Sequence, residues 1–271
     1  MEKKLLFFDI DGTLIDEKGN FPESAKDAIR KAQQGGHLCF VNTGRTASIV
    51  LDWLPRECEF DGYLCGCGTH LIFHDRILKH RSFTPEQGQR IIDGLEKYKI
   101  DAILEGIDND FHNEIDRMHT ETFRNYILKH GGDRKWGSYQ EAVGRFDKFY
   151  CFADRAGAVT EFGEEYRDLL DLIDREQGFY EVVPKGFSKA SGMDDLLEYL
   201  NGTGEYEAPF TRENTVAIGD SGNDLPMLMH AGCAIAMGNS SKVVLEAADY
   251  ITGSVLGNGI AEALEWLGVC S

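Results

Sequence analysis

The sequence predicts an α/β protein with a Rossmann-like parallel-sheet core and an inserted α+β domain. Three observations predict this fold. The first third of the chain alternates short apolar strands with amphipathic helices, and the last third returns to the same alternation, which is the order of a doubly wound parallel sheet. Between them, residues 76–183 have a mixed pattern that is richer in aromatic and charged residues. A stretch of roughly 100 residues is long enough for a domain of its own.

Buried strands and helices alternate in the first third. The expected strands are residues 4–10, 37–42 and 63–65, and the expected helices are residues 22–34 and 46–54. The first strand is almost entirely apolar, as in a strand that is buried on both faces of a sheet. Gly35 and Gly36 stop the first helix, and Pro55 is expected to end the second, because proline lacks the backbone N–H that a helix needs.

The inserted domain is expected at residues 83–185. Its expected helices are residues 85–98, 121–130 and 160–177, and its expected strands are residues 100–105, 148–153 and 180–183. This order fits helices that pack on one face of a mostly antiparallel sheet.

The last third completes the core, which we expect to comprise residues 1–82 and 186–271. Its expected strands are residues 215–218, 234–237 and 250–251, and its expected helices are residues 191–200, 225–231, 241–247 and 259–267. The segment 201–212 is rich in Gly, Glu and Pro, which favours a loop.

The composition restricts the classes of partner. Acidic residues number 46 against 28 basic ones, for a net charge of −18, which argues against a nucleic acid or an anionic membrane surface as partner. No apolar run reaches the 18 residues typical of a membrane span. The seven cysteines are an odd number, and several of them lie in apolar, strand-like segments. We interpret them as reduced thiols of a cytoplasmic protein. No feature of the sequence indicates an oligomeric state.

Two carboxylates follow the first expected strand, in the segment Asp9-Ile10-Asp11-Gly12-Thr13. Ligand sites of open α/β sheets lie at the carboxyl ends of strands. Residues i and i+2 of a strand point to the same side, so Asp9 and Asp11 can face one site. Two carboxylates at so short a distance repel each other unless a cation or a shared proton lies between them. The alternative is a turn in which these side chains only cap backbone groups.

A second acidic segment, Gly219-Asp220-Ser221-Gly222-Asn223-Asp224, follows the expected strand at 215–218. Asn223 or Asp224 could simply cap the next helix. However, two acidic strand ends in one α/β core supply the hard oxygen ligands that suit Mg²⁺. Mg²⁺ keeps some of its waters and leaves positions for a substrate phosphate.

Two further segments carry groups that could hold an anion. Thr43-Gly44-Arg45 follows the second expected strand and offers a hydroxyl and a backbone N–H on a tight turn, although Thr43 could instead cap the following helix. Lys189 lies where the chain re-enters the core, before an expected helix. A single lysine is usually solvated, so its importance depends on the other segments.

Together the four segments resemble the haloacid dehalogenase-like (HAD) phosphatase superfamily, and within it the Cof-type phosphatases with a large α/β cap. Asp-x-Asp-Gly-Thr at 9–13, Thr-Gly-Arg at 43–45, Lys189 and Gly-Asp-x-x-Asn-Asp at 219–224 occur in the family's order. The insertion between the second and third of these also matches the large-cap class, so the resemblance covers the whole chain.

The resemblance implies a Mg²⁺-dependent phosphatase that acts on a small phosphorylated metabolite, such as a sugar or polyol phosphate. Asp9 would be the nucleophile that forms an aspartyl-phosphate, and Asp11 the general acid and then the base. The resemblance implies that Asp9 and Asp220 bind Mg²⁺, with Asp224 bound directly or through water and Asp11 near the metal through its backbone carbonyl.

The resemblance also implies the phosphate contacts. Thr43, the Gly44 N–H and Lys189 would hold the phosphoryl oxygens and offset the charge that develops on them, and Asn223 would help to position the phosphate or Lys189. A cap would close over the core, exclude water and select the leaving group. One departure is Cys67-Gly68-Thr69, where many relatives carry Asn-Gly-Ala; a thiol cannot donate as an amide does, so no substrate contact is transferred to Cys67.

Two alternatives remain open. A phosphomutase or phosphotransferase on the same fold would pass the aspartyl-phosphate to a sugar hydroxyl instead of water. A non-catalytic sugar-phosphate sensor would bind without turnover, although a sensor has no need of both Asp9 and Asp11.

Overall fold

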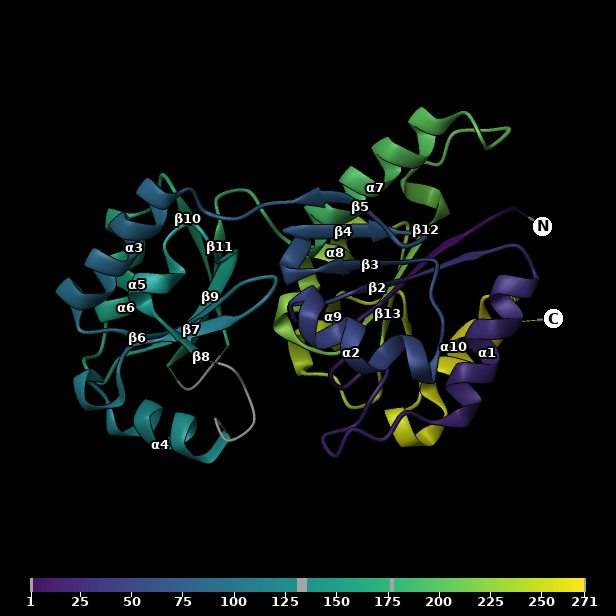
Figure 1. Ribbon diagram of the computed structural model, residues 1–271. Helices are drawn as coiled ribbons and strands as arrows, with labels where there is room; N and C mark the ends of the chain where they lie inside the picture. The colour runs from purple at the N-terminus through teal and green to yellow at the C-terminus, as the bar shows by residue number, and fades with distance from the viewer. Residues whose placement is uncertain (1, 131–135, 176–177, 271) are drawn as a thin grey trace. The chain divides into compact units, whose positions relative to one another are not determined.

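The computed structural model describes residues 2–130, 136–175 and 178–270 (Figure 1). The chain divides into two compact units, one formed by Met1–Lys79 with Ser188–Ser271 and the other by His80–Phe187. Each unit has its own sheet. Within the described residues, no helix is long and apolar enough to cross a membrane.

The first unit is built on an eight-stranded sheet with the order β14-β13-β12-β1-β2-β3-β4-β5. Its six parallel strands are β1 (Leu5–Phe8), β2 (Leu38–Asn42), β3 (Gly62–Cys65), β12 (Thr215–Gly219), β13 (Cys233–Ala236) and β14 (Tyr250–Ile251). The strand β4 (His70–Phe73) pairs with β3 in the antiparallel direction, and β5 (Arg76–His80) forms the edge. The sequence pattern did not predict β4 and β5, which extend the core sheet.

Helices cover both faces of this sheet, as the alternation of side chains along β1 requires. Leu6 and Phe8 face the layer of α1 (Glu23–Gln34), α2 (Ala47–Glu57) and α10 (Gly259–Trp266). Leu5 and Phe7 face the layer of α7 (Lys189–Thr203), α8 (Leu225–His230) and α9 (Lys242–Ala247). The prediction of a Rossmann-like core is confirmed, because a mainly parallel sheet lies between two layers of helices.

One helix end differs from the expectation. Pro55 does not end α2, which continues to Glu57 with the proline in its last turn. There the proline removes only the bond to the carbonyl of Leu51, a residue that is exposed, so water can satisfy that group.

The second unit is built on a six-stranded sheet with the order β10-β11-β9-β6-β7-β8. Its strands are β6 (Asp101–Glu105), β7 (Asp110–His112), β8 (Trp136–Ser138), β9 (Lys148–Phe152), β10 (Leu170–Asp174) and β11 (Phe179–Pro184). All the neighbouring strands pair in the antiparallel direction except β7 and β8, which are parallel. The α+β character expected of the insertion is therefore present.

Helices lie on both faces of this second sheet, so the expectation of a single covered face is wrong. Leu104 of β6 packs in the core formed with α3 (Pro85–Tyr98), α5 (Tyr139–Ala142) and α6 (Ala158–Glu165). Its neighbour Ile103 packs instead with Phe123 and Ile127 of α4 (Glu121–His130). Phe123 and Ile127 are four residues apart and share one face of α4, which is how a short helix covers the opposite side.

The expected helix at residues 160–177 is confirmed only in its first part, by α6 (Ala158–Glu165), and is wrong beyond Glu165. The helix α6 ends at Glu165, and β10 follows from Leu170 to Asp174; residues 176 and 177 lie outside the described residues. Apolar side chains point to both sides of β10, with Leu172 opposite Val182 and Ile173 opposite Glu181 of β11. Their spacing therefore also fits a helical pattern.

Candidate active site

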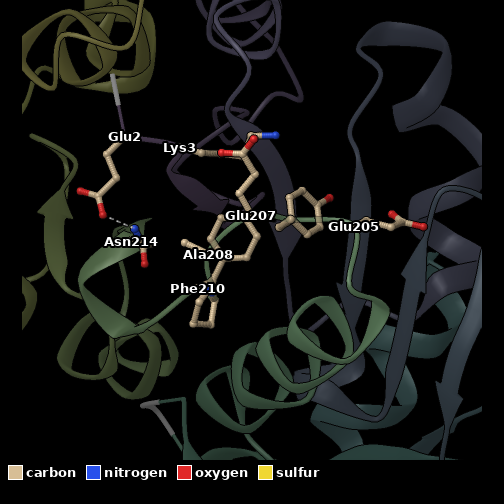
Figure 2. A pocket seen from close by; sticks show the side chains of 9 residues that line it. Glu2, Lys3, Glu205, Glu207, Ala208, Phe210 and Asn214 are labelled. Carbon is tan, nitrogen blue, oxygen red and sulfur yellow. Dashed lines mark hydrogen bonds between the residues drawn. The ribbon is translucent and has the colours of Figure 1, made fainter.

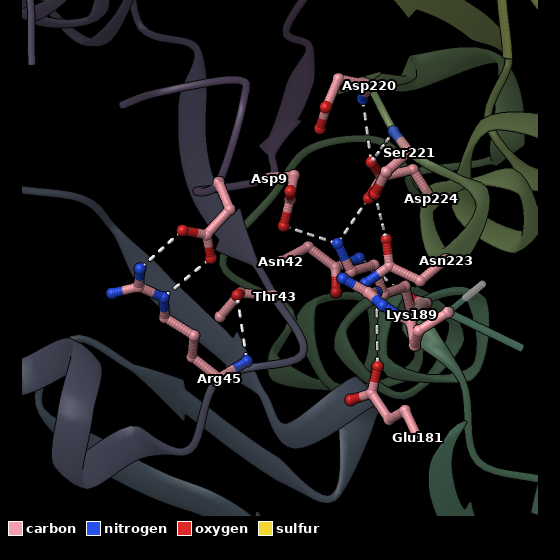
Figure 3. A network of polar contacts seen from close by, with 12 residues as sticks. Asp9, Asn42, Thr43, Arg45, Glu181, Lys189, Asp220, Ser221, Asn223 and Asp224 are labelled. Atoms are coloured by element: carbon pink, nitrogen blue, oxygen red, sulfur yellow. Dashed lines mark hydrogen bonds and ion pairs between the residues drawn. The ribbon is translucent and has the colours of Figure 1, made fainter. Parts of the chain in front are cut away.

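Three parallel strands end side by side and carry the polar residues that the sequence singled out. The strand β1 lies between β2 and β12, so the carboxyl ends of the three strands meet at one edge of the sheet. Asp9 follows β1, Thr43 follows β2 and Asp220 follows β12. Lys189 is the first residue of α7 and reaches the same point (Figure 3). Residues from four distant segments therefore converge there.

Lys189 joins two of the carboxylates. Its Nζ donates to Oδ1 of Asp9 at 2.6 Å and to Oδ1 of Asp224 at 2.5 Å (Figure 3). Lys189 is only 1% exposed, and both acids are buried as well. Burial alone would lower the pKa of the Lys189 ammonium, but the carboxylates of Asp224 and Asp9 outweigh burial and hold this pKa above its usual range. Lys189 is therefore a buried, permanently charged cation.

The carboxylates outnumber this cation. Burial raises the pKa of Asp9 to about 7, with a further rise from Asp224 and an opposing effect of Lys189. Burial also raises the pKa of Asp220 to about 8, and Asp9 and Asp224 add to the rise. The site thus holds more negative charge than Lys189 can balance, and protons make up the difference near neutral pH.

The same three acids fit a divalent cation. Asp9, Asp220 and Asp224 each offer a carboxylate oxygen, and these oxygens lie within 4.8 Å of one another. Oδ1 of Asp220 is buried without a hydrogen-bond partner. Hard carboxylate oxygens are the ligands that Mg²⁺ prefers, and a cation there would satisfy both the orphaned oxygen and the excess of negative charge. The donor set therefore suits Mg²⁺.

Two glycines make room for these carboxylates. Gly12 has a φ of +79°, and a Cβ at this position would lie 2.3 Å from Oδ2 of Asp220. A Cβ at Gly219 would lie 2.6 Å from Cγ of Asp224. Oδ2 of Asp224 in turn accepts from the backbone N–H of Asp220 at 2.9 Å and of Ser221 at 3.0 Å. The acidic loop is thus shaped around its own side chains, and neither glycine can be replaced without moving one.

The carboxylate of Asp11 points elsewhere. Its side chain is 56% exposed and pairs with the guanidinium of Arg45. Nε of Arg45 donates to Oδ2 at 2.8 Å, and Nη2 donates to Oδ1 at 2.6 Å. This fork-like pair uses both oxygens. Asp11 therefore lies beside the three-acid cluster with a cation of its own.

The expected phosphate contacts lie at the same edge of the sheet. Thr43 is buried, and its Oγ1 accepts from the backbone N–H of Arg45 at 3.1 Å, which leaves the hydroxyl hydrogen able to donate. Gly44 is buried in the turn between them. Oδ1 of Asn223 accepts from the hydroxyl of Ser221 at 2.6 Å, so the amide group of Asn223 can donate to another group.

The sequence pattern missed two residues of this site, Arg45 as the partner of Asp11, and Asn42. Asn42 ends β2, and its Nδ2 donates to the backbone carbonyl of Lys189 at 2.9 Å. Its Oδ1 is buried without a partner. A polar residue at the end of an apolar strand was the available signal for Asn42. Its contact with Lys189 fixes the start of α7 against β2.

The second unit carries a cavity of about 200 Å³, lined by His80, Ser82, Ile107, Asp108, Asn109, Phe111, Gly144 and Arg145. Asp108 and Asn109 supply polar groups to this lining from the loop between β6 and β7. The nearby Asn113 is instead buried and donates to Glu96 at 2.8 Å, which is a contact within the unit. The polar lining around Phe111 suits a small molecule that carries hydroxyl groups.

The first unit has a larger cavity of about 420 Å³ that shares no residue with the carboxylate cluster. It is formed by Glu2, Lys3, Asn214 and the segment 205–210 (Figure 2). Lys3 stacks over Tyr206 at 5.0 Å from the ring centre, and Asn214 donates to Glu2 at 2.9 Å. Lys3 and Asn214 are thus engaged with other residues of the cavity, which is separate from the carboxylate cluster.

Comparison with known proteins gives consistent matches over nearly the whole chain. Residues 6–264 match the family of haloacid dehalogenase-like hydrolases. The chain is 28% identical to "Putative phosphatase YkrA" of Bacillus subtilis (strain 168), over 99% of each chain. It is 26% identical to 5-amino-6-(5-phospho-D-ribitylamino)uracil phosphatase YcsE of the same organism, over 96% of this chain and 94% of that one.

Solved structures show the same fold. The HAD subclass IIB sugar phosphatase BT4131 superimposes with a TM-score of 0.79 at 24% identity, over 98% of this chain and 100% of that one. At this identity the similarity concerns the fold.

Proposed function

Because this chain belongs to the haloacid dehalogenase-like hydrolases, as a phosphoric monoester hydrolase of their Cof type, we propose that it hydrolyses the phosphate ester of a small sugar or polyol. We further propose that Asp9 is the nucleophile and that Mg²⁺ is the cofactor. The observation that carries the proposal is the contact of Lys189 with both Asp9 and Asp224 inside a cluster of three carboxylates.

In the proposed reaction Asp9 acts as an ionised carboxylate, the form that the Lys189 ammonium and a bound Mg²⁺ would favour. Its Oδ1 is held by Lys189, so the other oxygen is available to attack phosphorus. The bond between phosphorus and the leaving oxygen breaks as the aspartyl-phosphate forms, and Asp11 gives a proton to the leaving alkoxide. Water then attacks the aspartyl-phosphate, Asp11 takes its proton, and inorganic phosphate leaves with Asp9 restored.

The remaining residues bind and balance charge. The Lys189 ammonium, the Thr43 hydroxyl and the Gly44 N–H would contact the phosphoryl oxygens, with the amide of Asn223 beside Lys189. The carboxylates of Asp9, Asp220 and Asp224 and the backbone carbonyl of Asp11 would hold Mg²⁺. When bound, Mg²⁺ offsets the charge of these acids and of the phosphate dianion.

The substrate class rests on the relatives and on the second unit. One relative is named for a phosphorylated ribityl compound and one structural neighbour is named a sugar phosphatase. Phosphate esters of this kind have a leaving group rich in hydroxyls. The cavity near Asp108 and Asn109 has a polar lining and a volume that suits a small polyol, and we assign selection of the leaving group to this unit.

The test is phosphate release from a panel of phosphorylated sugars, polyols, nucleotides and cofactors, with and without Mg²⁺. Asp9→Asn serves as the blank, and Asp52→Asn, which removes one charge from an exposed side chain of α2, is the matched control. We expect Mg²⁺-dependent release that Asp9→Asn lowers by at least about 10³-fold and that Asp52→Asn leaves unchanged. No release from any member of the panel would refute the proposal, and transfer to an added sugar without free phosphate would identify a phosphotransferase.

A further inference from the structure

Arg45 contacts the site through its guanidinium, its backbone N–H and its backbone carbonyl. Its guanidinium holds both oxygens of Asp11 at 2.6 and 2.8 Å. Its backbone N–H donates to the hydroxyl of Thr43 at 3.1 Å, and its carbonyl accepts from the N–H of Gly66 at 2.8 Å. The turn that carries the phosphate contacts therefore also carries the partner of Asp11.

The geometry of the Arg45–Asp11 pair restricts the side-chain rotamers of Asp11. An exposed aspartate on a glycine-containing loop has several rotamers of similar energy, and only some of them direct an oxygen toward a leaving group. A bidentate guanidinium selects one orientation of the carboxylate plane. A carboxyl group has about four lone-pair sites, so two hydrogen bonds from Arg45 still leave sites for the proton that is exchanged with the leaving group.

We propose that Arg45 is the positioning residue for Asp11, and that it acts on the step in which the leaving group is protonated. The inference rests on the proposed function, in which Asp11 is the general acid. Arg45 itself transfers no proton in this scheme. It fixes the orientation of the Asp11 carboxyl group through both oxygens, and the hydrogen bond of its backbone N–H to Thr43 keeps Arg45 in place.

If Arg45 positions Asp11, the effect of removing Arg45 on kcat/KM should depend on the leaving group. An alkyl alkoxide is a poor leaving group and needs a proton from Asp11, whereas p-nitrophenolate is stable as an anion and hardly needs one. We compare kcat/KM for a sugar or polyol phosphate with kcat/KM for p-nitrophenyl phosphate, because kcat/KM includes the steps up to release of the leaving group and excludes later hydrolysis of the aspartyl-phosphate.

For Arg45→Ala we expect kcat/KM to fall about 10- to 100-fold on the alkyl ester and less than about 3-fold on p-nitrophenyl phosphate, since general acid catalysis supplies about 10² to 10⁴-fold. Arg45→Lys keeps the charge but not the fork, and should fall between Arg45→Ala and the unchanged enzyme. Asp11→Asn should show the same selective loss, and adding Arg45→Ala to it should cost no further selectivity, because the two residues act as one unit.

The controls separate the possible failures. Equal losses on both esters would assign Arg45 to phosphate binding and overturn the inference, as would a double variant whose losses multiply. A change in the unfolding temperature that matches the loss on both substrates would indicate a purely structural role and also overturn it. An unchanged enzyme that releases no phosphate at all would overturn the proposed function together with this inference.

Discussion

Asp220→Asn should stabilise the metal-free protein even though it removes a residue assigned to the metal site. In the folded protein the pKa of Asp220 is about 8, because burial, Asp9 and Asp224 all disfavour its ionised form, against an ordinary value of 3.8. The folded state thus binds this proton more tightly than the unfolded chain does. Stability from this group is therefore fully present below about pH 4 and is lost as the pH rises toward 8.

The magnitude follows from the same difference. At about 1.4 kcal/mol per pKa unit, ionised Asp220 costs the folded protein at most about 6 kcal/mol. Asp220 is partly exposed, so water screens its charge, and neighbouring acids share the protons. We therefore expect Asp220→Asn to recover about 1–2 kcal/mol at pH 8.5, or a rise of about 2–8 °C in the unfolding temperature.

The assay is thermal unfolding in EDTA at pH 5 and pH 8.5, followed by titration with Mg²⁺. The gain from Asp220→Asn should be less than half as large at pH 5, where Asp220 is already protonated in the folded protein. Mg²⁺ should raise the unfolding temperature of the unchanged protein at pH 8.5, because ligands that bind only the folded state stabilise it, and should have little effect on Asp220→Asn. Asp52→Asn, with the same change of charge at an exposed site, should neither raise the unfolding temperature nor reduce the response to Mg²⁺.

A lower unfolding temperature for Asp220→Asn at pH 8.5 would refute the reasoning. It would mean that Asp220 gains more from its contacts in the folded protein than it loses by burial. An equal response of both proteins to Mg²⁺ would separately remove Asp220 from the metal site.

Two further predictions concern Lys189 and Gly12. Lys189→Met leaves two buried carboxylates without their cation, so the free energy of unfolding in denaturant should fall by about 3 kcal/mol at pH 8 and recover part of this at pH 5; equal losses at both pH values would contradict the charge argument. Gly12→Ala places a Cβ 2.3 Å from Oδ2 of Asp220 at a φ of +79°, and should weaken Mg²⁺ binding at least about 10-fold beyond the strain of about 1–2 kcal/mol. Gly19→Ala, at a φ of +80° in open space, should show only the backbone strain, and identical Mg²⁺ affinities in the two variants would refute the role of the close contact.

The sequence pattern predicts the core well because its strands are buried on both faces. The run before Asp9 has no polar residue that could face water, so only a central strand of a covered sheet suits it. Once that strand and its parallel neighbours are placed, the position of the residues that follow them is determined by topology. The convergence of Asp9, Thr43 and Asp220 is a consequence of strand order, which sequence pattern can reach.

The sequence pattern gives a wrong prediction where the spacing of the apolar residues fits both a helix and a strand. In β10, Leu172 faces one side of its sheet and Ile173 the other, and the strand is defined by its pairing with β11 rather than by its own residues. β7, β8 and α5 are only three or four residues long, which is too short for any periodicity to show. Local sequence carries no record of such long-range pairing.

The distribution of charge within the site also could not be predicted from the sequence pattern, and it leaves Asp220 without an ion pair among the described residues. The loop ends bring together four acids, and the nearby cations divide among them. Lys189 forms ion pairs with Asp9 and Asp224. Arg45 forms an ion pair with Asp11, which lies 34 residues away in the sequence. In the described part of the chain, no lysine or arginine forms an ion pair with Asp220, whose Oδ1 is buried without a partner. Because the nearby side-chain cations pair with the other three acids, Asp220 depends on an external cation to balance its charge. These two pairings, which the sequence could not reveal, therefore favour the proposed binding of Mg²⁺ at Asp220.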